Sequence, residues 1–212
     1  MTHPISVILL VLGSFLLGSV PVGVIVSKSR GVNLFDVGSK STGATNVYRA
    51  LGLTWAIIVF LLDALKGAIP TLVARFLMPN HQSLWALVGV FAVVGHCYSP
   101  WIGFKGGKGV ATILGVFLAA SPFVALSGFG VFFIVLFALR YMSIASLAGV
   151  FSAAGFAILY HDDVWMVPLY LIVFSLTLYR HRGNLARLKA GTEPKFSIKK
   201  SDTLILKDSP HA

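Results

Sequence analysis

Residues 103–109 read GFKGGKG, so four glycines and two lysines occupy seven positions between two apolar runs. Glycine has no Cβ, which lets backbone N–H groups approach a ligand closely, and lysine supplies positive charge. A helix that begins near Gly107 would direct its free N–H groups and the positive end of its dipole toward this loop. The segment predicts an anion site, most often for phosphate, and a flexible turn with basic residues is the alternative.

This loop matches neither of the two common nucleotide-binding motifs. A Walker A loop has glycine five residues before its Gly-Lys pair and serine or threonine after it. Those positions hold Ile102 and Gly109. A dinucleotide fingerprint needs a preceding strand, and none is predicted. The loop is therefore a candidate phosphate site of another kind.

Residues 38–49 read GSKSTGATNVYR and form a second polar segment. Ser39 or Ser41 could cap a short helix that runs toward Arg49. The density of hydroxyl, amide and guanidinium donors favours a polar-ligand site over a plain connecting loop.

Asp63 and Lys66 are ionisable residues in an otherwise apolar segment. They are three residues apart and so share one face of a helix. Charges at membrane depth are costly and are usually functional or paired. We favour a structural ion pair over direct contact with substrate.

The composition indicates a polytopic membrane protein. Of 212 residues, 57% are hydrophobic and 11% charged, with a mean hydropathy of +0.87, whereas soluble domains carry about 25% charged residues. The net charge of +10 then indicates orientation and contact with anionic lipid, not nucleic acid. The single Cys97 excludes an internal disulfide framework, and the six histidines do not cluster, so we expect no metal site.

Seven apolar segments are predicted to cross or enter the membrane: 5–26, 53–77, 83–101, 110–120, 122–139, 143–160 and 164–178. A spanning helix needs about 20 residues, so 110–120 is a tilted or shortened helix. The first span follows no Lys or Arg and is taken as an uncleaved helix that Pro21 kinks. Tight turns are expected at 140–143 and 161–163. We predict one all-α polytopic domain, 1–196, and a basic cytoplasmic tail, 197–212.

The distribution of basic residues predicts an external N-terminus and a cytoplasmic C-terminus. With this orientation, 15 of the 17 Lys and Arg lie inside: Lys28, Arg30, Lys40, Arg49, Lys105, Lys108, Arg140, Arg180, Arg182, Arg187, Lys189, Lys195, Lys199, Lys200 and Lys207. Both polar loops, the turn at Ser143 and the tail then share the cytoplasmic side.

These segments together resemble the bacterial integral-membrane acyl-phosphate-dependent glycerol-3-phosphate acyltransferases. The matching pieces are Gly38-Ser39, GATNVYR at 43–49, DALKG at 63–67, Gly95-His96, FKGGKGVAT at 104–112, Ser143, HRGN at 181–184 and GTE at 191–193. The resemblance implies transfer of a fatty acyl group from acyl phosphate to glycerol 3-phosphate. The products would be 1-acyl-glycerol 3-phosphate (lysophosphatidic acid) and phosphate, in the first acylation step of bacterial phospholipid biosynthesis.

The resemblance also implies roles for individual residues. The catalytic residues would be Ser39, Arg49, Lys105, Ser143, His181 and Asn184. Those that bind substrate phosphate would be Thr45, Asn46, Gly106, Gly107 and Lys108, with the two glycines as a phosphate cradle, and Asp63, Lys66 and His96 would be structural. This chain has Lys40-Ser41 where family members often have Gly-Asn, and Gly183 where they often have an acidic residue. The second difference removes a possible carboxylate from the site.

The family's chemistry suits these donors and cations. A phosphate with a second pKa of about 6 is a good leaving group, and the site must hold two phosphates and stabilise an oxyanion. We expect direct attack by the glycerol hydroxyl without an acyl-enzyme, with His181 as base, orienting group or structural residue. A His-x-x-x-x-Asp pair is absent, because Trp101 and Ala186 stand five residues after His96 and His181.

The resemblance implies no cofactor, no metal, and neither acyl carrier protein nor coenzyme A as donor, and it leaves the oligomeric state open. It places the protein in the bacterial inner membrane with its active site on the cytoplasmic side. Two other functions fit parts of the pattern. One is a transporter of a small phosphorylated anion, and the other is a scaffold whose basic loops hold anionic lipid.

Overall fold

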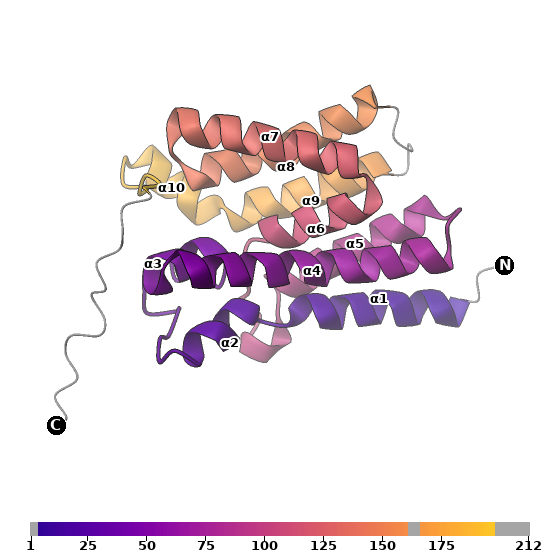
Figure 1. Cartoon of the computed structure of the whole chain (residues 1–212), viewed down its shortest axis with the longest axis horizontal. Coiled ribbons are helices and arrows are strands. Elements are labelled where there is room, and N and C mark those ends of the chain that lie inside the picture. The colour runs from indigo at the N-terminus through magenta and orange to yellow at the C-terminus, as the bar shows by residue number, and fades with distance from the viewer. Residues whose placement is uncertain (1–3, 161–165, 198–212) are drawn as a thin grey trace.

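The computed structural model describes residues 4–160 and 166–197, and this part of the chain is helical, with no strand in it. Its helices form one bundle, and the long ones lie side by side (Figure 1). They are α1 (Pro4–Ser19), α2 (Val22–Lys28), α3 (Ala44–Leu51), α4 (Leu53–Leu77), α5 (Gln82–Cys97), the 3₁₀ turn η1 (Pro100–Ile102), α6 (Val110–Ala120), α7 (Pro122–Leu139), α8 (Met142–Leu159), α9 (Met166–Arg180) and α10 (Arg182–Lys189).

Within the described ranges, five segments are long and apolar enough to cross a membrane, namely α1 with α2, α4, α5 with η1, α7 and α8. α6 and α9 are shorter apolar helices. The predicted all-α polytopic fold with about seven apolar helices is confirmed. The predicted bounds 53–77, 110–120 and 122–139 agree with α4, α6 and α7. The expected turn at 161–163 and the tail after Ser197 lie outside the described residues.

The first predicted span is two helices, because the chain breaks at Val20 and Pro21. Proline has no N–H to continue the helical ladder, so the predicted kink is present as a full interruption. Lys66 Nζ donates a hydrogen bond to the Val20 carbonyl oxygen at 2.9 Å. The α4 lysine thus satisfies an oxygen at the break between α1 and α2.

The short helix predicted to run toward Arg49 is α3. Its N-cap is Gly43, and no side chain caps it, so the expected cap from Ser39 or Ser41 is wrong. Both serines instead line the cavities described below.

Helix α6 lies between α4 and α7 (Figure 1). The close approach to α4 requires Gly67, because a Cβ there would overlap the backbone of Thr112. α6 begins at Val110, as the apolar run 110–120 predicts, and three residues after the start near Gly107 that the anion-site argument assumes, since Gly109 turns the loop into the helix with φ at +87°. α4 and α7 form the walls of a groove, and α6 forms its floor.

The buried core lies among α5, α6, α7, α8 and α9. Large apolar side chains also point outward, and Phe76 of α4 and Ile134 of α7 are 85% and 69% exposed. Such a surface suits lipid, because the exposed side chains are apolar and the helices satisfy their own backbone hydrogen bonds.

Candidate active site

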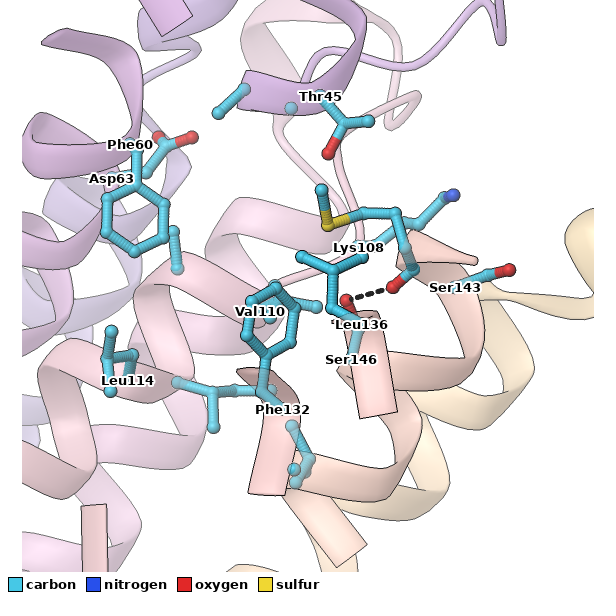
Figure 2. A pocket seen from close by; sticks show the side chains of 18 of the residues that line it. Thr45, Phe60, Asp63, Lys108, Val110, Leu114, Phe132, Leu136, Ser143 and Ser146 are labelled. Atoms are coloured by element: carbon cyan, nitrogen blue, oxygen red, sulfur yellow. Dashed lines mark hydrogen bonds between the residues drawn. The ribbon is translucent and has the colours of Figure 1, made fainter. Parts of the chain in front are cut away.

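A cavity of about 490 Å³ extends from α3 and α10 into the groove between α4 and α7. We call it the long cavity. Its polar lining residues are Ser39, Ser41, Thr45, Asn46, Tyr48, Arg49, Asp63, His96, Lys108, Ser143, Ser146, His181, Asn184 and Glu193. Figure 2 shows Thr45, Lys108 and Ser143 at one end and the apolar side chains of Leu114 and Phe132 farther along. The long cavity therefore joins a polar end to an apolar groove.

A second cavity of about 1050 Å³ adjoins the first and is strongly basic, and we call it the basic cavity. Its charged lining residues are Lys28, Lys40, Lys105, Lys108, Arg180, Arg182 and Arg187, and no carboxylate of the described ranges lines it. The two cavities share Ser39, Ser41, Lys108 and Asn184. A water-soluble anion and an apolar chain can thus meet at these four residues.

A hydrogen-bonded chain fixes the shared polar end. Lys108 Nζ donates to Asn184 Oδ1 at 2.5 Å, and Asn184 Nδ2 donates to Glu193 Oε1 at 2.6 Å. Ser143 Oγ donates to the same carboxylate oxygen at 3.0 Å, and Arg187 Nε donates to Oε2 at 2.8 Å. One buried carboxylate therefore holds groups from α8, α10 and, through Asn184, the lysine loop.

Burial and neighbouring groups shift the pKa values of Glu193 and Lys108 in this hydrogen-bonded network. Burial alone would raise the pKa of Glu193, but hydrogen bonds from Asn184, Ser143 and Arg187 hold it below its usual range. Burial, helped by nearby arginines and opposed by Glu193, lowers the pKa of Lys108 to about 8. Lys108 is therefore mostly a cation at neutral pH, and a bound phosphate would favour the charged form further.

His181 presents one ring nitrogen as an acceptor. Its Nδ1 lies 2.8 Å from the Thr177 carbonyl oxygen, which can only accept, so Nδ1 carries the hydrogen and Nε2 does not. Burial and the neighbouring Lys108 lower the pKa of His181 to about 4. The ring is neutral, lines the long cavity, and can accept a hydrogen bond from a ligand hydroxyl.

Arg49, in the last turn of α3, contributes a second cation to the long cavity. Burial lowers its pKa, but arginine stays protonated. Within residues 4–160 and 166–197 its guanidinium makes no hydrogen bond or salt bridge, so its donors are available to an anion. Ser39 and Thr45 line the same end of the cavity.

Asn46, which is expected to bind phosphate, also holds the loop before α3 together through its side chain. Its Nδ2 donates to the carbonyl oxygens of Leu34 and Val37, both at 3.1 Å, and its Oδ1 accepts from the Ser39 N–H at 2.9 Å. The side chain is 1% exposed and fully engaged. Asn46 therefore positions Ser39, and it also lines the long cavity.

Gly106 and Gly107, the glycines expected to cradle phosphate, lie against the end of α5, and Gly106 lines the basic cavity. The Gly107 N–H donates to the His96 carbonyl at 3.1 Å, and the Gly106 and Gly107 carbonyls accept from Arg180 at 2.5 and 3.0 Å. A Cβ at either glycine would overlap His96. The two glycines thus let the loop pack on the end of α5, which brings Lys108 into the site.

The predicted pair of Asp63 and Lys66 is present and extends to His96. Lys66 Nζ lies 2.8 Å and His96 Nδ1 lies 3.6 Å from Asp63 Oδ1, and all three side chains are buried. The His96 ring contacts Gly107, so this group connects α4 and α5 to the lysine loop. Asp63 and His96 also line the long cavity.

Comparison with known proteins identifies the family. The family described as glycerol-3-phosphate acyltransferase matches residues 8–191. The chain belongs to this family. The glycerol-3-phosphate acyltransferase of Geotalea daltonii is 40% identical over 192 residues, which cover 90% of this chain and 98% of that protein. The Aquifex aeolicus acyltransferase is 43% identical over 187 residues, covering 88% and 97%.

Two solved structures share this acyltransferase fold. The glycerol 3-phosphate form of PlsY, an integral membrane glycerol 3-phosphate acyltransferase, has a TM-score of 0.88 and 42% identity and covers 91% of this chain and 96% of its own. The lysophosphatidic acid form has a TM-score of 0.86 and 41% identity, with the same coverage. The chain is thus an acyltransferase, and the transporter and scaffold alternatives are set aside.

The predicted site residues of this acyltransferase are not all brought together. Lys105 is exposed and lines only the basic cavity, whereas Lys108 lines both cavities. Glu193 was not predicted as a site residue, although the GTE run at 191–193 was among the matching pieces. The sequence does not show that Ser143, Asn184 and Arg187 donate hydrogen bonds to the Glu193 carboxylate, because only the fold brings them to it.

Proposed function

We propose that this protein transfers a fatty acyl group from acyl phosphate to glycerol 3-phosphate, with lysophosphatidic acid and phosphate as products. The observation that carries this proposal is the junction of an apolar cavity and a basic cavity at Lys108 and Asn184. The two related PlsY structures are a glycerol 3-phosphate form and a lysophosphatidic acid form, which supports the same acceptor and product here.

The basic cavity suits glycerol 3-phosphate, a water-soluble anion. Its cations attract a dianion, and the absence of carboxylates from its described lining avoids repulsion. At the junction, Ser39 and Lys108 supply a hydroxyl and a charge. Arg49 lines the polar end of the long cavity, and its planar guanidinium offers a pair of donors for a phosphate.

The long cavity suits a donor with a fatty chain and an anionic head. The chain would occupy the apolar groove, and the acyl phosphate head would lie at the polar end. Phosphate is a good leaving group, since its second pKa is about 6. The reaction then requires positioning and charge stabilisation more than a strong acid, and it requires neither acyl carrier protein nor coenzyme A.

The proposed reaction is direct attack by a glycerol hydroxyl on the acyl carbonyl. His181 Nε2 accepts a hydrogen bond from the hydroxyl and orients it, and Lys108 and Arg49 stabilise the oxyanion and the departing phosphate. The new ester C–O bond forms and the carbonyl–phosphate C–O bond breaks. The hydroxyl proton ends on the released phosphate. Ser143 donates to Glu193 and so is not set up as a nucleophile.

We further propose that residues 1–196 form one integral-membrane domain of the bacterial inner membrane, with 197–212 as a basic cytoplasmic tail. The N-terminus lies outside and the active site faces the cytoplasm. The basic cavity gathers cations from three separate segments of the chain, namely 28–40, 105–108 and 180–187, which supports this orientation by the positive-inside rule.

The test is product formation by purified protein in detergent, supplied with palmitoyl phosphate and glycerol 3-phosphate. We expect lysophosphatidic acid and phosphate in equal amounts, and no product when palmitoyl-coenzyme A replaces palmitoyl phosphate. Folded protein that forms no product with acyl phosphates of several lengths would contradict the proposal.

Glu193→Gln is expected to lower kcat/KM at neutral pH by about tenfold to a hundredfold, because small displacements of reacting groups are costly. The amide cannot accept from Arg187 as the carboxylate does, and Lys108 loses a charge that raises its pKa. The alkaline limit of activity should therefore move to lower pH. Asp36→Asn, at a surface carboxylate that accepts from Asn33, is the matched control. An unchanged pH profile in Glu193→Gln would contradict the assignment.

A further inference from the structure

The apolar part of the long cavity follows one face of α7. The α7 residues that line it recur with helical spacing and are Ala125, Gly128, Phe129, Phe132, Phe133, Leu136 and Phe137. From Phe137 near the polar end to Ala125, this face is about 18 Å long at about 1.5 Å per residue. One leaflet of a bilayer is about 15 Å deep, half of a core of about 30 Å. The groove therefore has the length of one acyl chain.

Phe117 of α6 and Ala125 of α7 lie at the far end of this groove, and they are only 3% and 2% exposed. Both belong to the main buried core, and the Phe117 ring packs edge-on against Tyr170 of α9 with ring centroids 4.6 Å apart. Phe133 and Phe137, nearer the polar end, are 39% and 73% exposed. The groove is thus open along its side near the polar end and closed at the far end.

The glycines of the groove leave little room for adjustment. A Cβ at Gly128 would lie 2.7 Å from the Gly149 carbonyl oxygen of α8, so the backbones of α7 and α8 touch at this level. Any added side chain there would separate the helices. Phe117 and Ala125 are the neighbouring positions where side-chain size sets the free length.

We propose that Phe117 and Ala125 set the longest acyl chain that this enzyme accepts efficiently. The inference rests on the proposed function, in which the acyl carbonyl lies near Lys108 and the chain follows α7. A chain longer than the groove must displace Phe117 from Tyr170 or leave through the open side. A chain shorter than the groove leaves apolar surface unfilled.

Two opposite substitutions test this assignment, with kcat/KM measured for lauroyl, palmitoyl and arachidoyl phosphate. Ala125→Leu shortens the groove and is expected to lower the palmitoyl-to-lauroyl ratio by at least about tenfold, as a single methylene can discriminate by this amount. Phe117→Ala lengthens the groove and is expected to raise the arachidoyl-to-palmitoyl ratio by a similar factor. Ratios within one variant are independent of the fraction that folds.

Two lipid-facing neighbours serve as matched controls. Leu126→Phe on α7 and Leu118→Ala on α6 change residues that are 59% and 38% exposed and lie outside the cavity lining, so both ratios should stay as in the wild type. Unchanged ratios in Ala125→Leu and Phe117→Ala, or equal losses at every length, would overturn the inference. A wild type inactive with all three acyl phosphates would instead overturn the proposed function.

Discussion

Lys108→Met is expected to lower kcat/KM by about a thousandfold. Loss of one preorganised donor at a developing oxyanion costs about a hundredfold to a thousandfold, and Lys108 also supplies a charge that both cavities share. Methionine keeps much of the side-chain volume, so the loss would report the charge. Steady-state rates with palmitoyl phosphate and glycerol 3-phosphate give the measurement.

The pH dependence of the wild type provides a second measure of Lys108. Its pKa of about 8 means that the cation is present below pH 8 and is lost as the pH rises through that value. Because the reaction needs the cation, kcat/KM of the free enzyme should fall above about pH 8. Lys108→Arg keeps the charge at all these pH values and should remove the alkaline limb in whatever activity it retains.

Lys105→Met is the matched comparison, since the sequence alone favoured Lys105 as the catalytic lysine. Lys105 is exposed at the basic cavity and does not line the long cavity. We expect KM for glycerol 3-phosphate to rise by about a few-fold or less at high salt, because salt screens exposed charges. If Lys105→Met is the inactive variant and Lys108→Met is not, the assignment of the two lysines is reversed.

Arg49→Ala is expected to lower kcat/KM by about a hundredfold to a thousandfold, with a large part of the loss in the binding of a phosphate. The guanidinium is half-buried at the polar end of the long cavity, and the described residues give it no hydrogen-bonding partner. Within the described residues, its donors are therefore available to a bound anion. Kinetics and an equilibrium measurement of glycerol 3-phosphate binding would separate the two contributions.

Two further variants serve as comparisons for Arg49→Ala. Arg49→Lys keeps the charge but not the planar pair of donors, and should recover only part of the activity. Arg30→Ala removes an arginine that stacks on Trp55, 3.9 Å from the ring centroid, and lies outside both cavities, so its activity should stay close to that of the wild type. Equal effects of Arg49→Ala and Arg30→Ala would contradict a direct role for Arg49.

Much of the fold could be predicted from hydropathy, because helix length in a membrane is set by the thickness of the hydrocarbon core. α4, α6 and α7 begin and end where their apolar runs do. The errors lie where local chemistry competes with hydropathy. Pro21 divides the first span, and Gly43 instead of a serine is the N-cap of α3.

The polar site was predicted as a set of residues but not as an arrangement. Asn46 and Gly107 have the residue types of a phosphate site, yet their groups are engaged by Ser39, Leu34 and the end of α5. A hydrogen bond that forms only when the chain folds back on itself leaves no mark in the local sequence of either partner. The same reason explains why the sequence did not select Glu193. Its partner Ser143 lies 50 residues away, and its nearer partners Asn184 and Arg187 reach it only because the chain turns back after α10.

The sequence by itself determined that this protein is a helical membrane protein, and its glycine, lysine and arginine motifs determined the family. These properties follow from composition and short-range spacing, which the chain carries in linear form. The tertiary structure decided which lysine reaches both cavities, which nitrogen of His181 accepts, and where the apolar groove ends at Phe117. These depend on distances between helices, and packing sets such distances only once the helices are assembled.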